Sequence, residues 1–346
     1  MSDQIQSTDV VIIGAGPVGM FAIFECGMLG MKCHVVDALD MVGGQCAALY
    51  PEKPIYDIPA HPMVSGGDLI ENLKKQAEPF DPVYHLNQRV ESLNRVDNDE
   101  WIVTTNTGNE IRTKAIIIAA GVGAFGPNRP PIEGIEAYEG ESVQYFVKKR
   151  EDYRGKKIVI AGGGDSAVDW VNSLAELAEK IYVVHRRPKF RAAPESVSQM
   201  EALSQGENSK VEMVIPYQLS GLKGEGNQIS HVTVADLEGN ERDLEADILL
   251  PFFGLAMNLG PIAEWGLELE NKHLSVNPRT AQTSAPGVYA IGDIAHYENK
   301  LKLILTGFAE AAQAAHSIRQ LVFPDQVFHF EYSTTSGVPG AQVNKA

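Results

Sequence analysis

Three glycines and a distant acid are the first sign of chemistry in this chain. Gly14, Gly16 and Gly19 form a G-x-G-x-x-G pattern after the β-branched run 10–13, which is typical of a buried parallel strand. In such a turn the first glycine permits a tight bend, the second lets the backbone approach a pyrophosphate, and the third packs helix against strand. Asp37 ends the next predicted strand, 23 residues after Gly14, where its carboxylate can accept hydrogen bonds from ribose hydroxyls. The pattern predicts a dinucleotide site that suits an unphosphorylated ribose, as in FAD.

The same arrangement recurs after the apolar run 157–161, with Ala167 in the place of the third glycine. The residues of this second turn that we expect to meet a phosphate are Gly162, Gly164, Asp165 and Ser166. His185 occupies the place of the acid, 23 residues after Gly162, and opens the basic stretch HRRPKFR. An acid here would repel a ribose 2′-phosphate, whereas arginines bind it, so the second site suits NADPH. The arginines that we expect to bind the 2′-phosphate are Arg186, Arg187 and Arg191.

Composition narrows the class of protein. At about 100–200 residues per domain, the 346 residues suggest two domains. Three cysteines without a CxxC pair exclude a disulfide framework and suggest a cytoplasmic location, and the polar start MSDQIQST lacks the basic region of a signal peptide. The apolar run 10–31 contains Pro17 and Glu25, so a strand, a turn and a buried helix explain it better than a membrane span. The formal net charge of −16 argues against binding to nucleic acid or to an anionic membrane.

Two further segments place small or acidic residues where a cofactor could pass. The run 113–123 reads as a buried strand that ends in small residues, and the run 287–295 reads as another strand that reaches Asp293. We expect Asp293 to hydrogen-bond the linker of the cofactor. A helix is predicted over 303–321, and its start at Thr306-Gly307 could stabilise negative charge on a reduced flavin ring.

The order of motifs along nearly the whole chain resembles that of a known family. The segments are GAGPVG, GGQCAALYPEKPIYDIP, AIIIAAG, GGGDSA, HRRPKFRA, VYAIGD and a C-terminal YSTTSG. Together they resemble the thioredoxin-reductase-like flavoproteins, and among these the ferredoxin–NADP reductases of that type. The resemblance implies an α/β fold of two Rossmann-like, three-layer dinucleotide-binding domains. It places an FAD domain at 1–124 and 253–346, and an NADPH domain, inserted into it, at 125–252.

The resemblance also implies which residues contact FAD. Tyr50 would lie against one face of the flavin ring, and Tyr332, from the C-terminal tail, would cap the other. Besides the glycine turn and Asp37, the remaining matched positions are Gln45, Val90, Phe125, Asp293 and Thr334. The resemblance further implies one non-covalent FAD per chain, NADPH as co-substrate and a homodimer.

The segment GGQCAALYP (43–51) bears on where electrons go. A Gly-Gly-x-Cys stretch often opens a redox-active cysteine pair in flavin disulfide reductases, but Cys46 has no partner and Pro51 stands where a second cysteine could be. The stretch before the second glycine turn, where thioredoxin reductases carry a CxxC, has no cysteine. The resemblance therefore implies hydride transfer between NADPH and FAD and one-electron transfer between FAD and ferredoxin or flavodoxin, without a catalytic acid, base, nucleophile or metal.

Other functions stay open on the sequence alone. An NADPH-dependent flavin diaphorase or oxidase would need the same motifs, and a disulfide reductase lacking its CxxC or a non-enzymatic NADP-binding sensor would share part of them. Ferredoxins and flavodoxins are usually acidic, so docking on this acidic chain would rely on local basic patches. The clusters KKR (148–150) and RGKK (154–157) are candidates.

Overall fold

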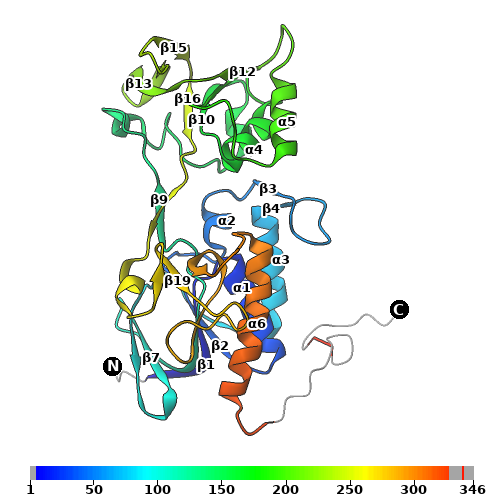
Figure 1. Ribbon diagram of the computed structural model, residues 1–346, viewed down its shortest axis with the longest axis vertical. Helices are drawn as coiled ribbons and strands as arrows, with labels where there is room; N and C mark the ends of the chain where they lie inside the picture. Colours follow the sequence, from blue (N-terminus) through cyan, green and yellow to red (C-terminus); the bar gives the residue numbers. More distant parts are fainter. Residues whose placement is uncertain (1–4, 327–336, 339–346) are drawn as a thin grey trace. The chain divides into compact units, whose positions relative to one another are not determined.

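The chain forms two compact units (Figure 1). Unit 1 consists of Met1–Ala124 together with Met257–Ala346, and unit 2 is Phe125–Ala256. Unit 2 is thus inserted into the sequence of unit 1. The residues that the computed structural model describes are 5–326, 337 and 338.

The chain passes from one unit to the other in two short strands. These are β9 (Ala124–Pro127) and β17 (Leu255–Asn258), which pair with each other as a two-stranded ribbon. The return to unit 1, between Ala256 and Met257, lies a few residues after the expected position at 253.

Unit 1 is built on a seven-stranded sheet with the order β5-β2-β1-β8-β7-β6, in which β20 also pairs with β8. The pairs of β1 with β2 and β8, of β2 with β5 and of β20 with β8 are parallel, while β7 pairs antiparallel with β8 and β6. The last four residues of β1 are all buried, as expected for a parallel strand covered on both faces. The strands are β1 (Gln6–Ile13), β2 (Cys33–Val36), β5 (Val83–His85), β6 (Val90–Arg95), β7 (Trp101–Thr105), β8 (Glu110–Ile118) and β20 (Val288–Ala290).

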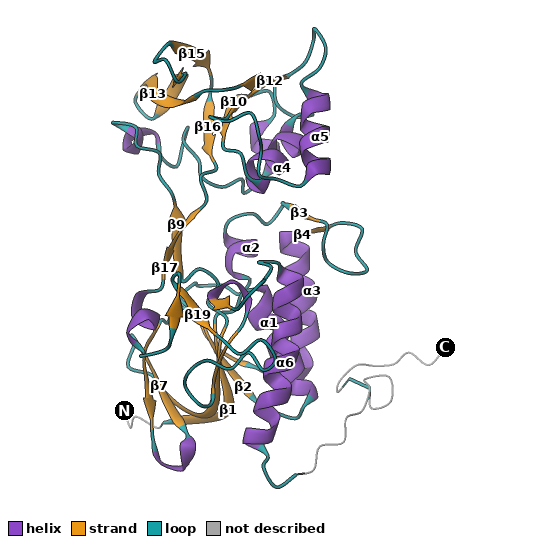
Figure 2. Cartoon of the chain, viewed as in Figure 1, coloured by secondary structure: helices purple, strands orange, loops and turns teal. Residues whose placement is uncertain are grey.

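Three helices cover one face of this sheet and run side by side (Figure 2). They are α1 (Pro17–Met28), α3 (Gly66–Ala77) and α6 (Ile304–Val322). α1 begins with Pro17, whose missing N–H suits the first position of a helix. α3 begins after Ser65, whose Oγ accepts a hydrogen bond of 3.0 Å from the backbone N–H of Asp68.

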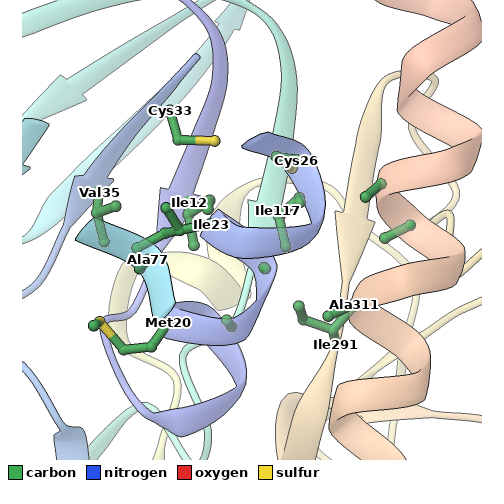
Figure 3. Packing of buried hydrophobic residues seen from close by; sticks show 14 of the residues in the cluster. Ile12, Met20, Ile23, Cys26, Cys33, Val35, Ala77, Ile117, Ile291 and Ala311 are labelled. Atoms are coloured by element: carbon green, nitrogen blue, oxygen red, sulfur yellow. The ribbon is translucent and has the colours of Figure 1, made fainter. Parts of the chain in front are cut away.

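The core beneath these helices consists of aliphatic side chains from the sheet and from the helices (Figure 3). Ile12 of β1 and Ile117 of β8 pack with Ile23 of α1, and Ala311 of α6 lies beside Ile291; each is at most 1% exposed. Full burial of one large aliphatic side chain contributes about 1.5–3 kcal/mol. This core therefore fixes α1 and α6 against the sheet, and with them the segments that lead into each helix.

The opposite face of the sheet packs against a smaller layer, so unit 1 has three layers. Leu274 of the strand β19 and Ile262 of the 3₁₀ helix η5 share a core with Val11 and Ile116 of the main sheet. The shorter elements of unit 1 are α2 (Gly44–Ala48), β3 (Pro54–Ile55), β4 (Val64–Ser65), β18 (Leu269–Glu270), β19 (His273–Ser275), β21 (Ala295–His296), η1 (Glu78–Phe80), η2 (Asp97–Asp99), η5 (Gly260–Glu264) and η6 (Gly292–Ile294).

Unit 2 has a four-stranded parallel sheet in the order β12-β11-β10-β16. On one face, Val159 and Leu249 share a core with Val232 and Leu244 of an antiparallel sheet, β13-β14-β15. The helix α4 packs against β10 and α5, and contributes no side chain to that core. The elements are β10 (Lys157–Ala161), α4 (Asp165–Leu174), β11 (Lys180–Val184), α5 (Pro194–Leu203), β12 (Val211–Val214), β13 (Gln218–Glu225), β14 (Gln228–Ala235), β15 (Glu241–Glu245), β16 (Ile248–Pro251), η3 (Ile135–Tyr138) and η4 (Arg150–Tyr153).

The predicted fold class, α/β with two Rossmann-like units, is confirmed. In the antiparallel sheet of unit 2, β14 is the central strand and pairs with both β13 and β15. Among the helices that the structure describes, none is long and apolar enough to cross a membrane.

Candidate nucleotide-binding sites

Two of the three glycines in the first turn are required by their surroundings. Gly14 has a φ of +108°, and a Cβ there would lie 2.4 Å from the carbonyl oxygen of Ala119, at the end of β8. A Cβ on Gly19 would lie 2.0 Å from the carbonyl oxygen of Gly14. Both contacts are with backbone, which cannot move aside, so these glycines let β1, β8 and α1 approach one another.

Gly16 is different, because no described atom outside its own neighbours in the chain lies within 4 Å of the position of its Cβ. Its φ of −70° is open to any residue, so the chain itself does not require glycine there. Gly16 is the N-cap of α1, whose first N–H groups have no partner within the helix. The open space before these donors fits a ligand phosphate, which is the role predicted for the second glycine.

Asp37 is held directly against the first turn. One carboxylate oxygen accepts a hydrogen bond of 2.6 Å from the Ala15 N–H, and the other accepts one of 2.8 Å from the Leu39 N–H. Burial raises the pKa of Asp37, while these two backbone bonds oppose that shift. Each carboxylate oxygen can accept a second hydrogen bond, so the oriented side chain keeps acceptor capacity for ribose hydroxyls.

Val90 is the first residue of β6, and the residues just before it in the chain contact Asp37 and Leu39. The Gln88 N–H donates to the Asp37 carbonyl oxygen at 3.0 Å, and the Asn87 N–H donates to Leu39 at 2.9 Å. The side chain of Val90 is buried in the core and only 4% exposed. A ligand at this position would therefore meet the backbone of Val90.

The segment that contains Cys46 wraps around the first turn. The Gly43 N–H donates to the Ala15 carbonyl oxygen at 2.7 Å, and a Cβ on Gly44 would lie 3.0 Å from the Cα of Gly16. The side-chain nitrogen of Gln45 lies 3.7 Å from the Cβ position of Gly121, just after β8. Gln45 is thus at the carboxyl edge of the sheet, where α/β folds bind ligands.

Cys46, Tyr50 and Asp293 form one electrostatic group beside this turn. Tyr50 and Cys46 interact with each other, Asp293 acts electrostatically on both, and the Lys53 ammonium lies 5.8 Å from the centre of the Tyr50 ring. Burial raises the pKa of Cys46 to about 11 and also raises the pKa of Tyr50. Cys46 is therefore a protonated thiol at neutral pH, which is a poor nucleophile.

The start of α6 and the turn that carries Asp293 both reach the first glycine turn through Val18. A Cβ on Gly307 would lie 2.4 Å from a Val18 methyl carbon, and one on Gly292, whose φ is +73°, would lie 3.5 Å from the same side chain. The structure therefore brings together the glycine turn, Asp37, Gln45, Tyr50, Asp293 and the Thr306-Gly307 helix start.

Three predicted FAD contacts cannot be followed in this way. Phe125 is the first residue of unit 2 and belongs to β9, and the structure describes its backbone without its side chain. Tyr332 and Thr334 lie outside the described residues.

In unit 2 the second glycine turn begins in a similar way. Gly162 has a φ of +152°, and a Cβ there would lie 2.7 Å from the carbonyl oxygen of Phe252 and 3.1 Å from the Cβ of Ala167. Gly164 is the N-cap of α4, and the nearest atom to its Cβ position is the Arg191 carbonyl oxygen at 4.0 Å. Like Gly16, Gly164 leaves room in front of a helix start.

His185 occupies a place that sequence reasoning did not foresee. A Cβ on Gly163 would lie 2.2 Å from the His185 ring, which also packs against Phe190 with ring centres 4.9 Å apart and planes tilted by 32°. Burial, helped by the neighbouring arginines, lowers the pKa of His185, while a 3.3 Å contact with the Lys189 carbonyl oxygen opposes this. The signal in the sequence was the extra glycine in the run 162–164, since Gly163 stands where the first turn has Ala15.

The loop that follows His185 closes back on the turn. The Arg191 N–H donates to the Gly163 carbonyl oxygen at 2.6 Å, and Asp165 accepts a hydrogen bond of 3.0 Å from the Ala193 N–H. Asp165 therefore holds the loop, while Ser166 beside it is exposed in the first turn of α4. The predicted arginines are all exposed and have no acidic partner in the part of the chain that the structure describes; they are Arg186, Arg187 and Arg191.

Comparison with known proteins identifies the family. A family model described as pyridine nucleotide-disulphide oxidoreductase matches residues 8–317. The chain belongs to the pyridine nucleotide-disulphide oxidoreductase family. It is therefore an oxidoreductase.

Relatives with curated names cover nearly the whole chain. A protein of Paramagnetospirillum magneticum named ferredoxin–NADP reductase is 59% identical over 332 residues, which are 96% of this chain and 98% of that protein. A protein of Rickettsia felis with the same name is 56% identical over 329 residues, 95% of this chain and 97% of that one. Among solved structures, a thioredoxin reductase from Lactococcus lactis matches with a TM-score of 0.78 at 25% identity, covering 92% of this chain and 99% of that one.

The basic clusters of this oxidoreductase are less positive than their sequence indicates. Arg150 pairs with Glu176 at 2.8 Å, and Lys157 pairs with Glu245 at 2.6 Å. Arg154 pairs with Glu151. Because carboxylates offset these charges, the clusters 148–150 and 154–157 offer a weaker field to an acidic partner than we expected.

Proposed function

We propose that the chain is an FAD-dependent ferredoxin–NADP reductase. The observation that carries this proposal is the 59% identity with a protein of that name over 96% of the chain. The arrangement of the candidate sites supports it, because unit 1 suits a dinucleotide with a plain ribose and unit 2 suits one with a 2′-phosphate.

The residues of unit 1 fit FAD. The open space at Gly16 leaves room for a pyrophosphate at the start of α1, and Asp37 is oriented to accept bonds from a ribose. Gln45, Tyr50 and Asp293 gather beside the same turn and would hold the linker and the flavin ring. When bound, FAD would supply the link between a two-electron hydride donor and one-electron acceptors.

The residues of unit 2 fit NADPH. Gly164 and the first N–H groups of α4 would bind the pyrophosphate, with Ser166 at the same helix start. Arg186, Arg187 and Arg191 would bind the 2′-phosphate, since their guanidinium groups are exposed and charge-assisted hydrogen bonds to phosphate are strong. His185, kept neutral by burial, would add no charge of its own.

The cysteines argue against a disulfide reductase. All three are free and buried within the core of unit 1. Burial keeps the third, Cys46, protonated. A dithiol relay needs an accessible thiolate, and none of these side chains provides one.

Several finer points belong to the same proposal. The electron carrier would be ferredoxin or flavodoxin, FAD would be bound non-covalently once per chain, and Tyr332 with Thr334 would complete the flavin site as the resemblance implies. The resemblance also supports a homodimer, and the cysteine content supports a cytoplasmic location.

The test is NADPH-driven reduction of cytochrome c by the purified protein, with and without ferredoxin, at low and at high salt. We expect ferredoxin to stimulate the rate many-fold at low salt and less at high salt, because charged rims act mainly on encounter. Chromatography of the cofactor released on denaturation should give FAD. No stimulation by ferredoxin or flavodoxin, together with rapid turnover of a disulfide substrate, would contradict the proposal.

A further inference from the structure

A buried carboxylate on α6 has no part in the function proposed above. Glu310 is only 3% exposed and accepts three hydrogen bonds. The Gly292 N–H donates to one oxygen at 2.7 Å, and the Tyr297 hydroxyl donates to the other at 2.8 Å. The Lys300 ammonium donates to that second oxygen as well.

The charge of Glu310 is balanced within the core of unit 1. The side chains of Lys300 and Glu310 are each 4% exposed, and the Lys300 ammonium also lies 5.1 Å from the centre of the Tyr297 ring. Transferring two charges out of water is costly, and apolar residues of similar volume often give equal or greater stability. The ion pair is therefore poorly explained by stability alone.

The three donors come from one stretch of chain that leads up to α6. Gly292 opens the η6 turn that carries Asp293, whereas Tyr297 and Lys300 lie in the segment between η6 and α6. Gly292 and Gly307 both face the Val18 side chain in the first glycine turn. A single carboxylate thus ties together the Asp293 turn, the connecting segment and α6.

We propose that Glu310, balanced by Lys300, is a positioning residue that fixes the Asp293 turn relative to the start of α6, so that both can contact FAD. The inference rests on the proposed function for its ligand. Without an acceptor at this position, the buried Gly292 N–H would lack a partner, and the turn would shift to find one. That shift would move Asp293, the next residue.

The test compares two double variants of the full chain that both remove the ion pair. Lys300→Met with Glu310→Gln keeps an amide oxygen for the Gly292 N–H, whereas Lys300→Met with Glu310→Leu does not. Titration of each apoprotein with FAD, followed by flavin fluorescence, gives the affinity. We expect the Gln pair to stay within about threefold of wild type and the Leu pair to weaken binding about tenfold or more, as loss of one buried hydrogen bond implies.

A second variant and a second measurement separate positioning from general destabilisation. Glu310→Asp keeps a charge for Lys300 but shortens the reach to Gly292, so it should also weaken FAD binding. Hydrogen exchange of the apoprotein reports the bond directly: the Gly292 amide should be protected in wild type and in the Gln pair, and exchange faster in the Leu pair and in Glu310→Asp. As a matched control, Arg112→Met with Glu100→Leu removes another ion pair of unit 1, 3.2 Å long, and should leave FAD affinity unchanged.

The possible results are distinguishable. If wild-type apoprotein binds FAD and the Leu pair and Glu310→Asp bind it equally well, the positioning role is wrong while the proposed function stands. If wild-type protein binds no FAD, the proposed function is wrong and this inference with it. Equal loss of affinity in the Gln and Leu pairs would assign the effect to charge and overturn positioning through Gly292.

Discussion

The two glycine turns share a plan of strand, turn and helix, yet they treat the residue after the second strand in opposite ways. In unit 1, Asp37 bends back and binds the Ala15 N–H at 2.6 Å. In unit 2, the His185 ring packs on Gly163. The packing is so close that a Cβ on Gly163 would lie 2.2 Å from the ring. The acid is fixed by backbone hydrogen bonds, whereas the histidine is fixed by ring packing with Phe190.

Under the proposed function, this difference would let one fold hold two ligands of unlike charge. A carboxylate needs donors, and the backbone of the first turn supplies them through Ala15 and Leu39. A ring needs space, and Gly163 supplies it by having no side chain. Because His185 turns inward, the residues after it are left exposed, and these are arginines. Under the proposed function, ligand preference would depend on the residue after the second strand together with the middle residue of the turn.

The largest effect, a loss of stability, should come from the third glycine of the first turn, Gly19. Gly19→Ala places a Cβ 2.0 Å from the Gly14 carbonyl oxygen, and overpacking against backbone costs about 3 kcal/mol. The corresponding residue of unit 2 is already Ala167, so the reverse change, Ala167→Gly, should cost only about 1 kcal/mol. Urea unfolding of the two apoproteins measures both values. Equal losses of stability would mean that the two turns pack alike at this position and that the first turn does not specifically require glycine there.

The next largest effect should come from removing the positive charge of the loop that follows β11 in unit 2. Arg186→Ala combined with Arg187→Ala should raise the KM for NADPH about a hundredfold or more, since two charge-assisted hydrogen bonds contribute about 1.5–3 kcal/mol each. The KM for NADH should hardly change. Steady-state kinetics with both nucleotides decide the point, and Arg154→Ala, in an ion pair elsewhere in unit 2, is the control. A similar loss with both cofactors would make the arginines structural.

A smaller effect should follow from filling the space under His185. Gly163→Ala places a Cβ where the ring now lies, so the ring and the loop after it must shift. We expect the dissociation constant for NADP+ to rise about tenfold, or about 1.4 kcal/mol, because the arginines lose their orientation. Isothermal titration measures it, with FAD content unchanged as the control. Unaltered affinity would show that the histidine ring does not set the loop.

The smallest effect is expected beside the first turn. Cys46→Ser removes a thiol that burial holds protonated, with a pKa raised to about 11, so electron transfer should not depend on it. Turnover with ferredoxin should therefore stay within about twofold of wild type, because the substitution removes no large interaction. A tenfold loss with FAD fully bound would restore the disulfide interpretation.

Much of the fold could be predicted because its elements are strongly patterned. The buried runs 10–13 and 157–161, each followed by glycines, predicted the two units, and the long helix expected over 303–321 is α6 at Ile304–Val322. Boundaries were less accurate: Pro17 lies within the predicted glycine turn 14–19, yet it is the first residue of α1. The strand β15 was not predicted, because only Leu244 among its five residues is buried and its sequence has no alternation.

The parts of the sites that escaped prediction depend on partners that only the fold brings together. Glu310 reads in the sequence as one polar residue in an alanine-rich helix, yet it meets Gly292, 18 residues away, in the core. The carboxylate of Asp165 accepts a hydrogen bond from the Ala193 N–H, 28 residues away, and its predicted contact with a phosphate stays a prediction. The roles of Val90, Tyr50 and the arginines toward ligands stay predictions.

The insertion of unit 2 also sets an order for biosynthesis. The ribosome releases the first 124 residues long before the strand β20, which lies beside β8, and the helix α6, which packs against α1. All strands of the inserted sheet emerge in between, so unit 2 can fold while unit 1 still lacks β20 of its main sheet, the small sheet β18-β19-β21 and the covering helix α6. During that interval the apolar surface of α1 that α6 later covers is exposed. The nascent chain is therefore most vulnerable to aggregation and most in need of chaperones while the second half of its sequence is being translated.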